Sequence, residues 1–169
     1  MRIAAAVCGV EVQEYKNDRI KESAYMGYRE IETTREIIDG TYKKQSLDPE
    51  IFADEKPFVP NEYITLTDGS ASALCVYRDN CIRLLKDMTA FGIRPQNRLQ
   101  RFALDALLAP AEEIPLVILR GPAGTAKTFL SMAAALDKTY TDEFSRQIGS
   151  TSYDKIYICL LYTSPSPRD

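Results

Sequence analysis

The chain has 169 residues, of which 45% are hydrophobic and 27% are charged. This size suits one ordinary domain or two small ones, and the composition is that of a folded globular protein rather than a disordered one. The net charge of −3 argues against tight nonspecific nucleic-acid binding by this chain alone. No apolar run approaches the roughly 20 residues that a membrane span needs, so we expect a cytoplasmic protein without a membrane partner.

The first third of the chain predicts short elements followed by a linker. The alternation in 28–32 predicts a strand. Thr33 followed by Glu36 is typical of a capping box that opens a short helix. The prolines in 47–60 predict a loop or linker. The apolar face of the short helix is expected to comprise Ile37, Ile38 and Tyr42.

A compact antiparallel meander is predicted next. Turn residues at 68–70 and at 78–80 separate three apolar runs of strand length, which favours tight hairpins. The three expected strands are 63–66, 73–77 and 81–85.

After residue 91 the pattern changes to α/β. Asn97 is a good N-cap for a helix through Leu108, with Leu99, Phe102, Ala103, Ala106 and Leu107 on its apolar face. The continuous apolar run 115–119 predicts a central parallel strand. Residues 128–136 predict a helix lying against that sheet, and 155–159 predict the next strand.

A phosphate-binding pattern joins the predicted strand 115–119 to the following helix. It resembles G-x-x-x-x-G-K-[ST], in which backbone N–H groups and the helix N-terminus cradle phosphates. Lys127 is expected to reach the β- and γ-phosphates of ATP, and Thr128 to ligate Mg²⁺. Ala126 replaces the usual second glycine, and we expect the loop to tolerate it. The expected cofactor-binding residues are Gly121, Pro122, Ala123, Gly124, Thr125, Ala126, Lys127 and Thr128.

Metal sites built from cysteine are not expected. The sequence has no histidine, and Cys8, Cys75, Cys81 and Cys159 form no CxxC pair, which excludes a mixed Cys/His zinc site and disfavours an all-cysteine one. We expect reduced, buried thiols. The acidic residues Asp18, Glu22, Glu30 and Glu32 are better interpreted as solvated surface than as a metal cluster.

The run that precedes and includes the phosphate-binding loop resembles the PhoH family. The residues that carry the resemblance are Phe91–Pro95, Asn97, Gln100–Asp105, Ile114–Val117 and the loop itself. It implies a P-loop NTPase fold of RecA type, here partial, and ATP hydrolysis coupled to RNA unwinding or cleavage in a homo-oligomer. Asn97 and Gln100 also match an Asn-x-x-Gln signature that recognises adenine in related helicases. Gln100 is equally well explained as a polar helix residue.

The resemblance extends upstream to proteins that fuse a PIN nuclease domain to the ATPase. On this interpretation 1–57 is the remnant of a PIN-like domain and its connector, 58–90 a small antiparallel segment, and 91–158 the first part of the ATPase domain. Residues 159–169 match one reading frame of a transposase-based sequencing adapter, so we expect a non-native tail. We expect the chain to be truncated at both ends and to lack turnover by itself.

Two other functions fit the same loop. A signalling or assembly module could bind nucleotide without turnover. A small-molecule kinase could carry the same loop, but it would give no role to 97–100 or to the long N-terminal region.

Overall fold

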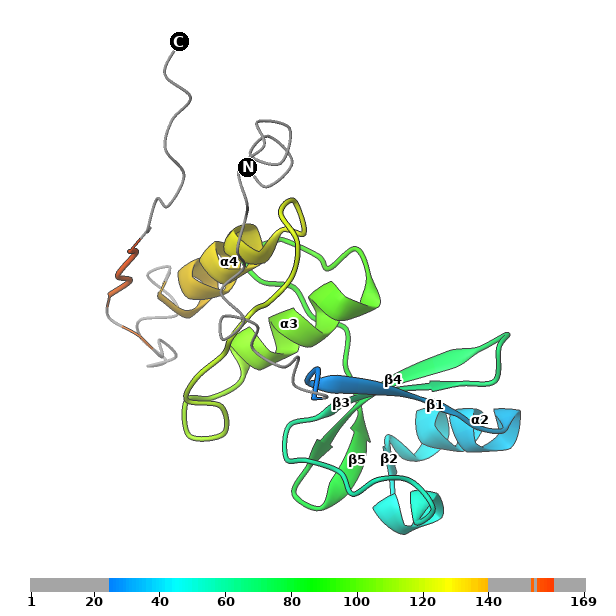
Figure 1. The fold of residues 1–169 in the computed structure, drawn as a ribbon. Helices are drawn as coiled ribbons and strands as arrows, with labels where there is room; N and C mark the ends of the chain where they lie inside the picture. The colour runs from blue at the N-terminus through cyan, green and yellow to red at the C-terminus, as the bar shows by residue number, and fades with distance from the viewer. Residues whose placement is uncertain (1–24, 140–152, 154, 160–169) are drawn as a thin grey trace, which may run out of the picture.

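A computed structural model describes residues 25–139, 153 and 155–159 of the chain. These residues form a mixed α/β fold in which helix α3 (Arg98–Leu108) lies between a sheet and helix α4 (Lys127–Thr139) (Figure 1). The expectations for 1–24 and 160–169, which include almost all of the expected non-native tail, lie outside the described residues. No helix in the described part of the chain is long and apolar enough to cross a membrane.

One five-stranded sheet forms the base of the fold, with the strand order β1-β3-β4-β5-β2. Strand β1 runs parallel to β3, and the other neighbours are antiparallel. The expected meander is confirmed, but the division expected between residues 57 and 58 falls inside this sheet, because β1 and β2 pair with strands of the meander. The strands are β1 (Tyr28–Glu32), β2 (Ser46–Leu47), β3 (Tyr63–Thr67), β4 (Ser72–Arg78) and β5 (Cys81–Leu84).

Both hairpin turns follow from their residues. Asp79 and Asn80 have φ values of 50° and 57°, as a type I′ turn requires, and these are residue types that tolerate positive φ. In the other turn the Asp68 carboxylate accepts hydrogen bonds from the Ala71 and Ser70 N–H groups. These bonds favour the charged form and lower the pKa of Asp68 to about 2.

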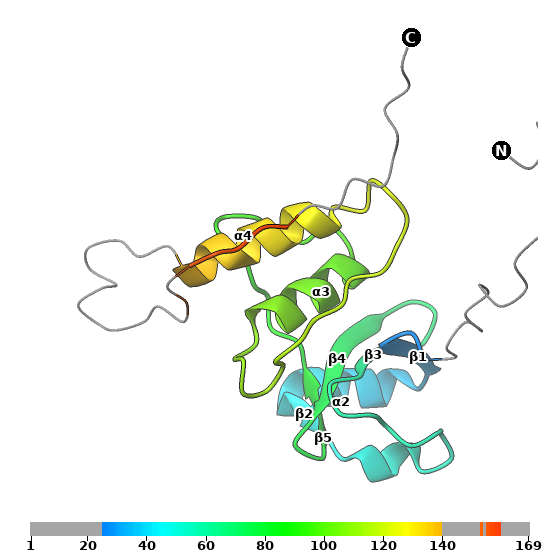
Figure 2. The ribbon, with the colours of Figure 1, turned by 60° about the vertical axis from the view of Figure 1, so that its left-hand side comes forward.

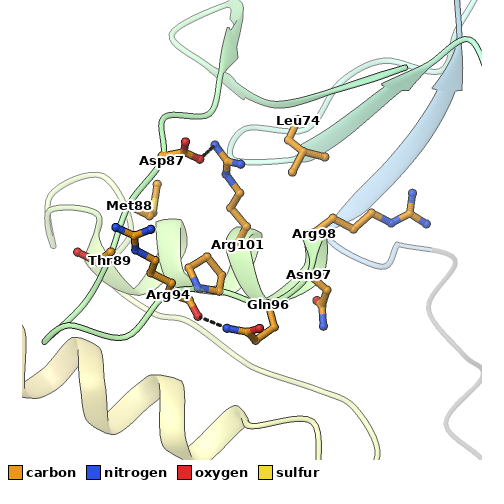
Figure 3. Close-up of a pocket in the computed structure, with 10 residues that line it drawn as sticks. Leu74, Asp87, Met88, Thr89, Arg94, Gln96, Asn97, Arg98 and Arg101 are labelled. Atoms are coloured by element: carbon orange, nitrogen blue, oxygen red, sulfur yellow. Dashed lines mark hydrogen bonds and ion pairs between the residues drawn. The ribbon is translucent and has the colours of Figure 1, made fainter. Parts of the chain in front are cut away.

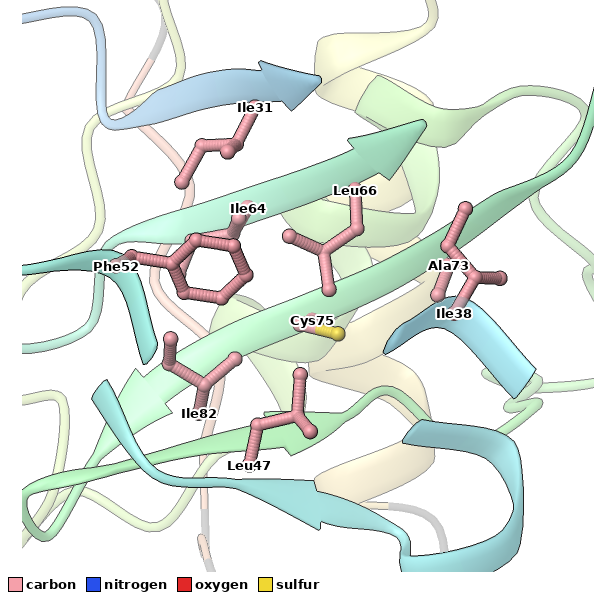
Figure 4. Packing of buried hydrophobic residues seen from close by; sticks show 9 residues of the cluster. All are labelled: Ile31, Ile38, Leu47, Phe52, Ile64, Leu66, Ala73, Cys75 and Ile82. Carbon is pink, nitrogen blue, oxygen red and sulfur yellow. The ribbon is translucent and has the colours of Figure 1, made fainter. Parts of the chain in front are cut away.

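The first hydrophobic core lies on the face of the sheet covered by helix α2 (Arg35–Lys44) and the 3₁₀ helix η2 (Pro49–Phe52) (Figure 4). Burial of each large aliphatic side chain there stabilises the fold by about 1.5–3 kcal/mol. Cys75 lies in this core, and its burial raises the pKa of the thiol to about 12, so the thiol stays protonated. Cys81 is only partly buried and Cys159 is exposed, so the expectation of buried thiols is wrong for both. The core residues are Ile31, Ile38, Leu47, Phe52, Ile64, Leu66, Ala73, Cys75 and Ile82.

The start of α2 differs from the expected capping box. The N-cap is Thr34, which makes no side-chain capping hydrogen bond. The Thr33 N–H, from which Glu36 would accept in the expected capping box, donates instead to the Thr67 carbonyl at 2.8 Å and continues the pairing of β1 with β3. Tyr42, expected on the apolar face of the helix, is 51% exposed. The expected loop 47–60 contains η2.

A second layer forms on the opposite face of the sheet. Phe102 of α3 stacks on Tyr63 of β3 with ring centroids 4.8 Å apart. On its other side α3 contributes Leu104 to a core with Leu130, Ala133 and Ala134 of α4. Small side chains on α4 let the two helices approach closely.

Helix α3 is confirmed, with Asn97 as its N-cap, but its expected apolar face needs correction. Leu99 is 46% exposed, whereas Leu104, which was not expected in the core, is fully buried. The reason is that the sheet and α4 cover α3 on two sides, so its buried surface is wider than the single stripe of a surface helix.

The expected strands 115–119 and 155–159 are not strands in the structure. Leu116, Ile118 and Tyr157 are 75%, 81% and 88% exposed. A strand needs a hydrogen-bonded neighbour, and neither segment has one among the described residues. The parallel sheet expected around the loop is therefore absent from the described part of the chain, where β1 and β3 form the single parallel pair.

Candidate functional site

The eight residues of the predicted phosphate-binding loop, 121–128, lie together at the start of α4 (Figure 2). Gly124 and Ala126 have φ values of 79° and 62°. Alternation between left-handed and ordinary backbone turns successive N–H groups toward one concave side, a nest that binds anions. The two left-handed residues of the loop are a backbone feature that such nests use.

The side chain of Lys127 turns back into this loop. Its Nζ donates to the carbonyl oxygens of Gly121 at 2.9 Å and of Pro122 at 2.6 Å, and to Thr125 Oγ1 at 3.1 Å. The Thr125 hydroxyl donates in turn to the Pro122 carbonyl. The loop therefore holds a positive charge inside its own curve, next to the nest.

Helix α4 adds its N-terminus to the site. The first N–H groups of a helix have no acceptor within the helix, and they form the positive end of its dipole. Thr128, in the first turn, is exposed, and within the described part of the chain its hydroxyl makes no hydrogen bond. The helix is fixed from outside, since the Phe91 N–H donates to Asp137 at 2.6 Å and Lys138 donates to the Ala109 carbonyl.

The strain at Ala126 leads to a prediction about loop stability. A residue with a Cβ pays roughly 1–2 kcal/mol in the left-handed region, whereas glycine costs about 0.5–1 kcal/mol in unfolded-chain entropy. We therefore expect Ala126→Gly to leave the free energy of unfolding unchanged or to raise it by up to about 1 kcal/mol, measured by urea unfolding. Ala123→Gly is the matched control. Because Ala123 has no positive φ, this variant should lower the free energy of unfolding by about 0.4–1 kcal/mol. Equal losses in both variants would contradict this account.

Gln100 has a structural role in the first turn of α3. Its N–H donates to Asn97 Oδ1 at 3.0 Å, and its Oε1 accepts from the Gln96 N–H at 2.8 Å. The two bonds close the helix start much as a capping box does, except that the Gln100 side chain accepts from the residue before the N-cap. Recognition of adenine by Gln100 stays a prediction.

The expected metal sites can be followed only in part. Asp18 and Glu22 lie outside the described residues. Glu30 and Glu32 lie on β1, and among the described residues no three acidic, cysteine or histidine side chains gather as a metal site.

A largely buried polar network between the sheet and α3 was not expected from the sequence. Asp105 Oδ2 accepts from Arg78 at 2.6 Å and from the Tyr63 hydroxyl at 2.8 Å. Burial, and then the negative charge of Asp105, raise the pKa of Tyr63 far above its usual value. An acidic residue on the buried side of α3 was the one signal that could have indicated it.

Comparison with known proteins points to one family. The chain is 34% identical to protein PhoH2 of Bacillus subtilis over 149 residues, which cover 82% of this chain and 33% of the relative. It is 30% identical to PhoH2 of Thermobispora bispora over 150 residues. This chain is similar to PhoH2 proteins. PhoH2 of Mycolicibacterium smegmatis is 29% identical, again over 150 residues.

The similarity to PhoH2 covers most of the chain but spans only about a third of the length of these relatives. It supports the resemblance to the PhoH family that the residues before the loop indicate. No protein-family model matches the chain, and no solved structure does.

Proposed function

We propose that residues 121–128 bind the phosphates of ATP and that the chain is part of a PhoH-type P-loop ATPase. The observation that carries the proposal is the Lys127 ammonium, which lies within 3.1 Å of three oxygens of the loop, beside the left-handed residues Gly124 and Ala126. Together with the N-terminus of α4 these groups place positive charge and N–H donors on one side of the loop. A polyphosphate needs this set of donors.

The residues also suit Mg²⁺ bound with the nucleotide. Mg²⁺ prefers oxygen ligands and usually binds through a few protein oxygens together with substrate phosphates. The exposed Thr128 hydroxyl in the first turn of α4 supplies such an oxygen. When bound, the ion would neutralise part of the phosphate charge.

The wider activity rests on the PhoH resemblance. We propose that the whole protein couples ATP hydrolysis to RNA unwinding or cleavage as a homo-oligomer, and that Gln100 contacts the adenine base. The same resemblance supports a PIN-like remnant and its connector within 1–57. The similarity to PhoH2 over most of this chain supports these proposals.

Binding of a fluorescent ATP analogue with and without Mg²⁺ tests the site. We expect ATP, but not AMP, to compete with the analogue. We expect Thr128→Val to weaken binding roughly tenfold in Mg²⁺, on the assumption that one oxygen ligand to the ion is worth as much as a hydrogen bond to a charged group, about 1.5–3 kcal/mol. In EDTA the variant and the wild type should be equal. Thr139→Val, at the far end of α4, is the matched control. Competition by AMP as strong as by ATP would remove the phosphate site from the proposal.

A further inference from the structure

An open cavity of about 550 Å³ lies where 87–89 and the start of α3 meet β4 (Figure 3). Three arginines line it, Arg94, Arg98 and Arg101, together with the side-chain amides of Gln96 and Asn97. None of residues 121–128 lines the cavity, and Gln100 does not line it either, although Asn97 of the Asn-x-x-Gln signature does. The cavity therefore holds a group of hydrogen-bond donors that is separate from the 121–128 loop.

Two of these arginines keep donor capacity free. Arg101 donates through Nη2 to the Leu85 carbonyl at 3.1 Å, and the same nitrogen forms an ion pair with Asp87 at 2.6 Å. Its Nε is buried and has no partner. Arg94 has no hydrogen bond or ion pair from its side chain within the described part of the chain. Figure 3 shows the guanidinium groups of Arg94 and Arg101 on the side of Asp87 and Met88, whereas Arg98 points toward β1.

The acidic groups at the cavity are held loosely. Asp87 is 95% exposed, whereas its partner Arg101 is only 26% exposed. Arg98 pairs with Glu30 at 2.8 Å, with both side chains about half exposed. Ion pairs with an exposed partner contribute little to stability. An incoming anion can therefore displace Asp87 into solvent at little cost, while Arg101 stays in place.

We propose that this cavity binds a phosphate group, distinct from the phosphates at the 121–128 loop, between Arg94 and Arg101. The planar guanidinium fork matches phosphate oxygens and can donate two bonds to them at once. Within the described part of the chain, neither the Arg101 Nη1 nor the Arg94 guanidinium has a partner, so such donors are unused in the free protein. The phosphate is either free or part of a single-stranded nucleic acid, and both sources present the same oxygens.

Two binding measurements on the whole chain separate these sources. One is the fluorescence anisotropy of a labelled oligouridylate, titrated at several salt concentrations, and the other is calorimetry with inorganic pyrophosphate. Whichever of the two ligands binds, we expect Arg94→Gln to lower its affinity roughly tenfold, as loss of a charged hydrogen bond does. If the oligouridylate is that ligand, its salt slope should also fall by about one. The matched control is Arg83→Gln, an exposed arginine paired with Asp79.

Asp87→Asn should change the affinity in the opposite direction to Arg94→Gln. Removing the carboxylate frees Arg101, so we expect severalfold tighter binding, whereas Asp79→Asn should change affinity much less. This variant leaves all three arginines in place and therefore tests the site even if an arginine variant fails to fold. Pyrophosphate binding that Arg94→Gln weakens and Lys127→Ala leaves unchanged would identify free phosphate as the ligand of the cavity, and oligouridylate binding that Arg94→Gln weakens would identify a strand.

The proposal is overturned if Arg94→Gln and Arg83→Gln bind both ligands equally, or if Asp87→Asn binds no tighter than Asp79→Asn. It is also overturned if Arg94→Gln lowers affinity for the fluorescent ATP analogue as much as Lys127→Ala does while leaving the oligouridylate unaffected, because the cavity would then belong to the nucleotide site. Since these measurements need no nucleotide at the loop, they can fail while the proposed ATP site stands.

Discussion

Replacing Lys127 by alanine is expected to weaken ATP binding by roughly 10- to 150-fold. The Nζ lies within hydrogen-bonding distance of Gly121, Pro122 and Thr125, so the charge is already held where the loop curves. A charge-assisted hydrogen bond is worth about 1.5–3 kcal/mol, and each 1.4 kcal/mol is tenfold in affinity. Displacement of a fluorescent ATP analogue measures the loss.

The control for this variant is Lys43→Ala, which removes the same charge from an exposed position on α2. The Gly121 and Pro122 carbonyls that lose the Lys127 bond are in exposed residues and can bond to water, so the melting temperature should hardly change. A variant that keeps wild-type affinity for ATP would remove Lys127 from the site. A large drop in melting temperature would instead give the lysine a structural role.

Local chemistry explains which elements were predictable. The Asp79–Asn80 turn, the Asn97 cap and the start of α4 each depend on residues within one or two turns of each other. Their conformations, including the positive φ at Asp79 and Asn80, follow from what those few residues can adopt. The backbone of the 121–128 loop belongs to the same class, because its residues are contiguous in the chain. Phosphate binding by this loop stays a prediction.

Long-range pairing explains what was not predictable. The parallel register that joins Tyr28 to Tyr63 brings β1 into the same sheet as the meander, and no local pattern indicates it. The apolar runs 115–119 and 155–159 have the composition of buried strands, but composition does not supply a hydrogen-bonded neighbour. The pairing of Arg78 with Asp105, 27 positions away, also cannot be inferred from the periodicity of the apolar residues.

That pair supports the second large prediction, which concerns stability. Arg78 and Asp105 are only 17% and 13% exposed, with 2.6 Å between the guanidinium and the carboxylate. Arg78→Met leaves the carboxylate with the Tyr63 hydroxyl as a neutral donor and without its cation. Breaking a buried ion pair costs about 3–5 kcal/mol, and because both groups keep slight exposure we expect about 3 kcal/mol, measured as the free energy of unfolding in urea.

A double replacement separates the pair from its surroundings. Combining Arg78→Met with Asp105→Leu removes both charges, so the loss should be smaller than the sum of the two single losses by at least about 1 kcal/mol. Arg83→Met on β5, whose partner Asp79 is 74% exposed, should change stability by no more than about 0.5 kcal/mol. Additive losses, or an Arg78→Met loss equal to that of Arg83→Met, would show that Asp105 does not depend on the arginine. A coupled loss would instead show that this pair ties β4 to α3, the helix that packs directly on α4.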